Sequence, residues 1–340
     1  MKRDERADDY LWDGSGEPDP EIVRLEELLA PYRHRGRMPE LPPRAMPQRR
    51  FAVHAAMQIL VTAASLLLVA VAAWFAYAVR PGGWTVQSLA GAPDVAGTRI
   101  DGPATLPIGG TMTTDDESRA RVDVASIGVV DVEPNSRVRL VVSRLGEHRL
   151  ALDRGQIRAL IWAPPQLFFV NTPSSTAIDL GCAYTLKVDD RGWGHLVVES
   201  GWVAFQHGGR ESFIPEKAMC ATRPGVGPGT PCYTDAAPSI VEALTILDFS
   251  PTQDVRRAAA LDTVLTLARP KDAFTLWHLL SRGTLAERAR VYERLASLVP
   301  PPQGVTRDAV LRGDRRALDA WWNTLGLDSA TWWRIWKRKW

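Results

Sequence analysis

A long uncharged run near the N-terminus constrains this chain more than any other feature. No Asp, Glu, Lys or Arg occurs at positions 51–79. The part from Ile59 to Val79, with Leu66 near its middle, is close to the ~20 apolar residues that a helix needs to cross bilayer hydrocarbon. A buried core helix of this length would normally show a polar stripe, and a signal peptide would begin at the N-terminus. The sequence therefore predicts a transmembrane helix over residues 51–80.

The charges that flank this run predict its orientation. The segment before it, residues 33–50, carries Glu40 as its one acidic residue against six arginines: Arg33, Arg35, Arg37, Arg44, Arg49 and Arg50. On the far side only Arg80 lies close. The positive-inside rule then places the N-terminus in the cytoplasm. In a bacterium, the chain would be a single-pass inner-membrane protein with its C-terminal domains in the periplasm.

The cysteines support an oxidising compartment. Three cysteines occur, Cys182, Cys220 and Cys232, and all lie on the predicted outer side. This distribution indicates at least one disulfide. We favour a Cys182–Cys220 pair and keep Cys220–Cys232 as the alternative, because spacing does not decide between them. The net charge of +2 gives no reason to expect direct nucleic-acid binding.

Residues 1–50 form a short predicted cytoplasmic module, a helix followed by a linker. Asp19 is a suitable N-cap and Pro20 suits the first helical position. One face of the helix is apolar and is a candidate docking face, formed by Ile22, Leu25, Leu28 and Leu29. Since one helix cannot bury its own face, it either docks on a partner or serves only as a topogenic tail. A Pro- and Arg-rich linker follows.

Residues 95–215 are predicted to be an all-β domain. Short apolar alternations recur with turn residues between them, as at Val122 and Val124, then at Val130 and Val132. Many short strands at this spacing indicate a β-roll, a sandwich or a solenoid.

A Gly/Pro-rich linker over 216–237 is predicted to lead into an all-α domain over 238–340. Several segments there place apolar residues at helical spacing. One of them begins with Thr284 and Glu287, which is the spacing of a capping box. The predicted fold class is thus multi-domain, with one transmembrane helix, an all-β domain and a C-terminal helical bundle.

The C-terminus is rich in tryptophan. Trp332, Trp333, Trp336 and Trp340 fall near one helical face, with basic residues largely off it. We expect these rings to pack the last helix onto the bundle. The alternative is a helix that lies on a membrane surface.

Small motifs follow one another in a fixed order over roughly residues 95–215: Gly110-Thr111, Ser118 to Ala120, Asn135-Ser136, Leu152 to Gly155, Thr172-Pro173, Gly181 to Tyr184 and Gly201 to Val203. In these motifs the β region resembles the FecR domain, the extracytoplasmic domain of membrane-anchored regulators of alternative sigma factors. The resemblance implies an all-β domain that binds a protein.

The chain also departs from this family. The usual Asp-Gly-Ser turn is replaced by residues 125–128, the cytoplasmic module is short, and a helical bundle follows the β domain. These departures bear on the sigma-factor partner and on the envelope partner more than on the fold.

The sequence offers no catalytic, metal or cofactor motif. The tail has His34 but no cysteine, which excludes the zinc-type module of some anti-sigma factors. The glycine-rich run over 223–231 lacks the Lys-Ser/Thr of a phosphate loop. We therefore expect a non-enzyme without a cofactor.

Two functions are compatible with these observations. The first is a membrane-anchored regulator whose extracytoplasmic β domain senses or binds an envelope partner. It would signal to a cytoplasmic partner such as a sigma factor, held by the cytoplasmic helix. The alternative is a periplasmic scaffold that binds proteins and has no transcriptional role.

Overall fold

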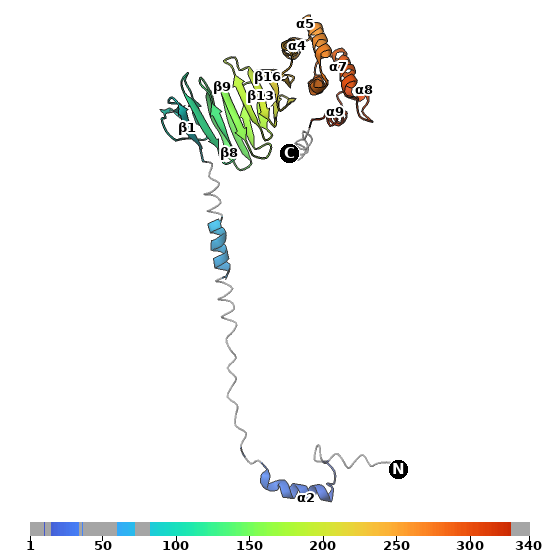
Figure 1. The fold of residues 1–340 in the computed structure, drawn as a ribbon. Helices are drawn as coiled ribbons and strands as arrows, with labels where there is room; N and C mark the ends of the chain where they lie inside the picture. The colour runs from blue at the N-terminus through green and yellow to red at the C-terminus, as the bar shows by residue number, and fades with distance from the viewer. Residues whose placement is uncertain (1–9, 11–14, 34–35, 37–59, 72–81, 328–340) are drawn as a thin grey trace. The chain divides into compact units, whose positions relative to one another are not determined.

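The structure is a computed structural model that describes residues 10, 15–33, 36, 60–71 and 82–327 (Figure 1). The chain divides into two compact units, Met1–Ala72 and Ala73–Trp340. In the first unit, α2 spans Pro20–Leu29 and the 3₁₀ helix η1 spans Ala30–Tyr32. The predicted cap of α2 is confirmed, because the Asp19 carboxylate accepts a hydrogen bond from the Glu21 N–H at 2.9 Å.

The predicted transmembrane helix is the main correction to the fold class. The described residues 60–71 are helical. Among the described residues, however, no helix combines the length and the apolar character needed to span a bilayer. The fold class that included such a span is therefore wrong for the part of the chain that the structure describes. Leu66 lies within the described helical residues, whereas Ile59 and Val79 lie outside them. The location at a bacterial inner membrane stays a prediction.

The described part of the second unit begins with 18 strands in one hydrogen-bonded network. In chain order they are β1 (Trp84–Ala90), β2 (Asp94–Val95), β3 (Thr98–Arg99), β4 (Ala104–Leu106), β5 (Thr111–Thr113), β6 (Arg119–Val124), β7 (Gly128–Val132), β8 (Arg137–Arg144), β9 (Glu147–Ile161), β10 (Phe168–Asn171), β11 (Thr176–Asp179), β12 (Ala183–Val188), β13 (Gly194–Ser200), β14 (Trp202–His207), β15 (Arg210–Pro215), β16 (Ala218–Arg223), β17 (Gly227–Pro228) and β18 (Cys232–Tyr233).

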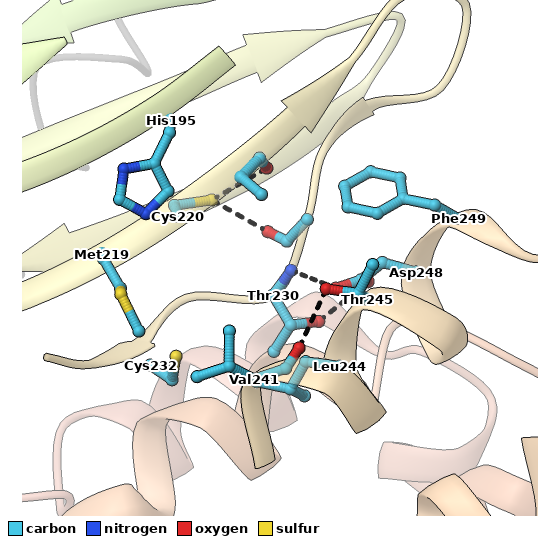
Figure 2. Close-up of a pocket in the computed structure, with 12 residues that line it drawn as sticks. His195, Met219, Cys220, Thr230, Cys232, Val241, Leu244, Thr245, Asp248 and Phe249 are labelled. Carbon is cyan, nitrogen blue, oxygen red and sulfur yellow. Dashed lines mark hydrogen bonds between the residues drawn. The ribbon is translucent and has the colours of Figure 1, made fainter. Parts of the chain in front are cut away.

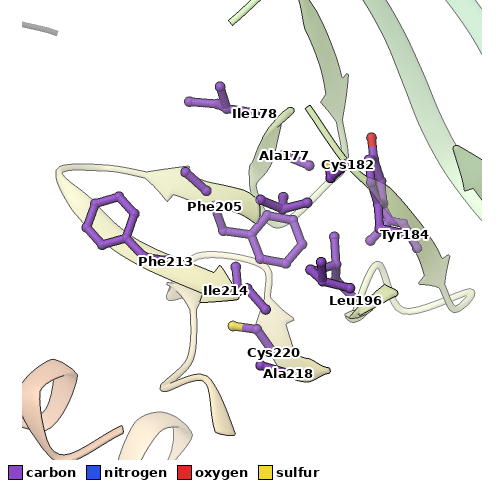
Figure 3. Packing of buried hydrophobic residues seen from close by; sticks show 14 of the residues in the cluster. Ala177, Ile178, Cys182, Tyr184, Leu196, Phe205, Phe213, Ile214, Ala218 and Cys220 are labelled. Carbon is purple, nitrogen blue, oxygen red and sulfur yellow. The ribbon is translucent and has the colours of Figure 1, made fainter. Parts of the chain in front are cut away.

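The network folds into two sheets that share β9. The first sheet runs β4-β1-β6-β7-β9-β12-β13-β16, with β17 and β18 on the far edge of β16. The second runs β3-β2-β5-β8-β9-β10-β11-β14-β15. Within this network the β9–β10 pair is parallel and every other pair is antiparallel. Side chains from both sheets share one core, in which Tyr184 and Leu196 of the first sheet lie near Phe205 of the second (Figure 3).

Strand β9 passes from one sheet to the other at Gly155. The backbone there has φ of +94°, and a Cβ at this position would lie 2.2 Å from Ser136 Oγ. The Ser136 hydroxyl in turn accepts a hydrogen bond from the Gln156 N–H at 2.9 Å. Two of the short motifs behind the family resemblance, Asn135-Ser136 and Leu152 to Gly155, therefore meet at this crossing. Gly201 is constrained in a similar way, because its Cβ would lie 2.2 Å from the Gly181 carbonyl oxygen.

The variant Gly155→Ala should destabilise the second unit by about 3 kcal/mol. An alanine at positive φ costs ~1–2 kcal/mol, and displacing Ser136 adds a packing cost of similar size. Urea unfolding of the full chain would measure the loss. Gly146→Ala is the matched control, since Gly146 also has positive φ, +85°, but has open space around it. Equal losses in the two variants would show that Ser136 does not constrain the crossing.

Helices complete the second unit beyond the last strands (Figure 1). They are α4 (Pro238–Phe249), α5 (Arg256–Leu267), η2 (Pro270–Asp272), α6 (Ala273–Leu279), α7 (Leu285–Leu298), α8 (Arg307–Leu311) and α9 (Arg315–Trp322). The predicted capping box of α7 is confirmed, because Thr284 and Glu287 each bond to the other's backbone N–H. The helices share one buried cluster with the strands, including Trp277, Trp321 and Trp322. The expected linker over 216–237 instead contains β16, β17 and β18.

Candidate functional site

Helix α2 presents an apolar face to solvent. Leu25, Leu28 and Leu29 are 57%, 67% and 59% exposed, and Ile22 is half-buried. No α2 residue is buried within the described part of its unit. A row of exposed leucines on one side of a capped helix suits insertion into an apolar groove of another protein. The four residues of the predicted docking face therefore lie on one helix, and both the docking and its partner stay predictions.

The charge on α2 is mainly acidic. Glu21, Glu26 and Glu27 lie in the helix with one basic residue, Arg24. Glu21 is in the first turn, where a carboxylate interacts favourably with the positive end of the helix dipole. Glu26 also accepts a hydrogen bond from the Tyr10 hydroxyl at 3.1 Å, and this contact raises the pKa of Tyr10. An acidic rim around an apolar face favours a partner with basic residues beside its groove.

In the second unit, His278 of α6 and Arg282, which follows α6, cap the edge strand β15. The Phe213 N–H donates to His278 Nε2 at 3.0 Å. Since Nε2 accepts, the neutral ring carries its proton on Nδ1, which lies 2.7 Å from the Phe274 carbonyl oxygen. Arg282 donates to the Glu211 carbonyl oxygen at 3.2 Å and to Ser212 Oγ at 2.7 Å. These groups occupy an edge that an unpaired strand would otherwise offer to another chain.

A buried ionic network lies beside this edge and joins β15, α4 and the turn after α6. Asp248 of α4 is 3% exposed, and its Oδ1 lies 2.7 Å from Arg210 and 3.1 Å from Arg282. The same carboxylate accepts hydrogen bonds from the N–H and the hydroxyl of Thr230 (Figure 2). The network thus holds two guanidinium groups against one carboxylate. Burial, and then the charge of Arg282, lower the pKa of Arg210.

The three cysteines are buried thiols in this structure. Neither predicted pair, Cys182–Cys220 or Cys220–Cys232, is bonded, and Cys220 instead donates to the Gly229 carbonyl oxygen at 3.2 Å (Figure 2). Burial raises the pKa of Cys220 and that of Cys232 to about 12. Thiols of this kind are poor nucleophiles. The described structure thus has no disulfide, and the pairing expected from the sequence stays a prediction.

Asp179 is a buried carboxyl at the end of β11 and is 1% exposed. Its Oδ1 accepts from the Gly181 N–H at 2.7 Å, and its Oδ2 accepts from the Cys182 thiol at 2.7 Å. Burial raises the pKa of Asp179 to about 7 despite these hydrogen bonds. The hydroxyl of Tyr184 is buried nearby without a hydrogen-bond partner among the described residues. This cluster lies in the core.

The predicted C-terminal tryptophans, Trp332, Trp333, Trp336 and Trp340, lie outside the described residues. The preceding pair, Trp321 and Trp322, is buried. Within the described residues, no group of three or more His, Cys, Asp or Glu side chains is arranged to hold a metal ion.

Sequence reasoning missed the network around Asp248 and the cap on β15. Their members are far apart in the chain, at positions 210, 230, 248, 278 and 282. Arginine and aspartate are also mostly exposed in folded proteins, so a sequence gives no reason to expect these to be buried together. No local pattern in the sequence marks their convergence.

Comparisons with known proteins find only a weak structural similarity. No family model matches the chain, and no curated protein matches it. Two crystal structures of a candidate anti-sigma factor from Parabacteroides distasonis ATCC 8503, at 1.65 and 2.50 Å resolution, match with 13% identity and a TM-score of 0.32. The matched regions cover 39% of this chain and 63% and 62% of those chains. By description they are regulators of the class that the resemblance implies, but a likeness this low carries no argument about fold or partner.

Proposed function

We propose that this chain is a regulator that acts by binding proteins. In this proposal, the apolar face of α2 binds a cytoplasmic partner of the sigma-factor class, and the second unit binds a partner in the cell envelope. The observation that carries the proposal is the exposure of Leu25, Leu28 and Leu29 on a capped helix. The order of the FecR-like motifs along the β strands supports the same reading. Fractionation of expressing cells would test the predicted location.

The double variant Leu25→Asp, Leu28→Asp should abolish binding of the cytoplasmic partner. Two buried leucines each contribute roughly 1.5–3 kcal/mol to an apolar contact, so their loss should weaken binding by at least a hundredfold. The measurement is co-purification of sigma factors with the full chain from cells of the source organism, followed by titration of the captured protein.

The matched control for this test is Arg24→Asp, Glu27→Asp. It changes the net charge by the same amount and leaves the leucines in place. The regulator proposal expects the control to bind as the native chain does. If no sigma factor co-purifies, or if both double variants bind equally, α2 is not the docking site, and a scaffold without a transcriptional role becomes the better account.

A further inference from the structure

The connections between the strands of the β region fall at two opposite ends. Every described strand pair except β9–β10 is antiparallel, and both termini of β9 lie at one end, since the His148 N–H donates to the Leu167 carbonyl oxygen at 2.8 Å. Successive connections therefore alternate between the ends. The chain enters where β1 begins at Trp84, whose Nε1–H donates to Ser143 Oγ beside the β8–β9 hairpin at 2.9 Å. We call this the entry end, and its connections are residues 96–97, 107–110, 125–127, 145–146, 162–167, 180–182, 201 and 216–217.

The two ends differ in charge. In the connections at the entry end, Glu216 and Lys217 are the only charged residues, and they form an ion pair at 3.2 Å. The connections at the opposite end carry seven acidic residues and one arginine: Asp101, Asp115, Asp116, Glu117, Glu133, Asp189, Asp190 and Arg191. Carboxylates are costly to remove from water. The entry end can therefore leave water at a much smaller electrostatic cost than the opposite end.

The entry end also exposes large apolar side chains. Leu145 and Trp162 are 83% and 62% exposed, and they are the two most exposed large apolar residues among the described residues 82–233. Leu145 forms the two-residue turn of the β8–β9 hairpin with Gly146, and Ile108 is 40% exposed in the turn after β4. Such turns are usually made by Gly, Pro, Asn, Asp or Ser. Large apolar groups exposed together at one end indicate an interaction surface.

The sequence just before the entry end is itself apolar. No charged residue occurs at positions 51–79, and β1 begins at Trp84, five residues after this run. Five residues reach at most ~18 Å. An uncharged run of this composition favours lipid over water. Lipid that holds this run would therefore lie next to the end of the β region that exposes Leu145, Trp162 and Ile108.

We propose that the entry end rests in the headgroup layer of a lipid bilayer, with Leu145, Ile108 and the ring of Trp162 buried in it. Tryptophan suits this layer because its ring is apolar while its N–H needs an acceptor. Here the Ser126 carbonyl oxygen accepts from Trp162 Nε1 at 3.1 Å, so the ring can enter lipid without leaving its N–H unpaired. The acidic end then points away from the bilayer. The inference rests on the proposed membrane location of the chain and is independent of what α2 binds.

Quenching of a dye by labelled lipid tests this. The full chain would be reconstituted into phosphatidylcholine vesicles that contain a nitroxide-labelled lipid, with a thiol-reactive dye on Leu145→Cys. The native chain, whose three cysteines are buried, is the blank. Asp190→Cys is the matched control, since Asp190 is 90% exposed in a turn at the opposite end. We expect quenching about threefold stronger at position 145 than at position 190, because apolar side chains of interfacial segments lie ~5–10 Å into the headgroup region.

A second pair of variants tests the apolar contact itself. In the chain labelled at position 145, Trp162→Ser should weaken quenching about twofold, because an aromatic ring supplies much of the buried apolar area. Trp193→Ser should leave quenching unchanged, since Trp193 belongs to a turn at the opposite end. Equal effects of these two variants would contradict a contact made by Trp162.

Flotation of the full chain with vesicles in a density gradient separates the two ways to fail. If the chain does not float, the proposed membrane location and this inference are both wrong. If it floats and the dyes at positions 145 and 190 are quenched equally, the location stands and the inference is overturned. The exposed apolar groups of the entry end would then be a surface for a protein partner instead.

Discussion

Replacing Asp248 by alanine is expected to destabilise the second unit by ~3–5 kcal/mol. The carboxylate is 3% exposed and is the shared acceptor for Arg210 and Arg282. Removing it leaves two partly or fully buried guanidinium groups facing each other, and breaking a buried ion pair in this way is costly because a charge remains without compensation. Thr230 also loses its acceptor. Urea unfolding of the full chain, followed by tryptophan fluorescence, measures the change.

Asp262→Ala provides the comparison for this result. Asp262 also pairs with an arginine, Arg290, but the two side chains are 60% and 49% exposed. An exposed pair of this kind contributes about 0–1 kcal/mol. If Asp248→Ala lowers the free energy of unfolding no more than Asp262→Ala does, the network around Asp248 does not hold the helices on β15. The role given to this network above would then be wrong.

The second large effect concerns the pH dependence of stability at Asp179. Its pKa is raised to about 7 in the folded chain from an ordinary value of 3.8. The folded state therefore binds this proton more tightly than the unfolded state. Below pH ~4 the Asp179 carboxyl is protonated in both the folded and the unfolded state, so it does not lower the free energy of unfolding. As pH rises from ~4 to ~7, stability falls by up to about 4 kcal/mol, and above that range the loss is constant.

The variant Asp179→Asn should remove this fall in stability between pH ~4 and ~7. An amide is neutral at every pH, and its oxygen can still accept from the Gly181 N–H. We expect the variant to be more stable than the native chain at pH 8 and closer to it at pH 5, as measured by urea unfolding at the two values. Asp190→Asn is the control, since Asp190 is 90% exposed. Parallel stability profiles for native chain and Asp179→Asn would contradict a proton held at this carboxyl.

Local patterns in the sequence predicted local structure well. The alternation of valines at 122, 124, 130 and 132 corresponds to the buried positions of β6 and β7. The caps at Asp19 and Thr284 are where the sequence placed them. These features succeed because each depends on residues a few positions apart, so the physical cause is contained in a short window.

Features that depend on distant partners could not be predicted in the same way. Strands β17 and β18 are two residues each and exist because they pair with β16, in a Gly- and Pro-rich stretch that has the composition of a linker. Burial of each cysteine thiol likewise depends on which strands and helices surround it.

The shared strand β9 has a consequence for how the second unit can respond to a bound partner. One half of β9 hydrogen-bonds to β8 and β10, and the other half to β7 and β12. The two sheets therefore cannot separate without disrupting the hydrogen bonds of β9, which is a central strand of both. Partial opening would cost nearly as much as global unfolding, so the β region should behave as a single cooperative block. Binding of a partner can then act only by displacing the whole β region or by changing which proteins the β region holds together.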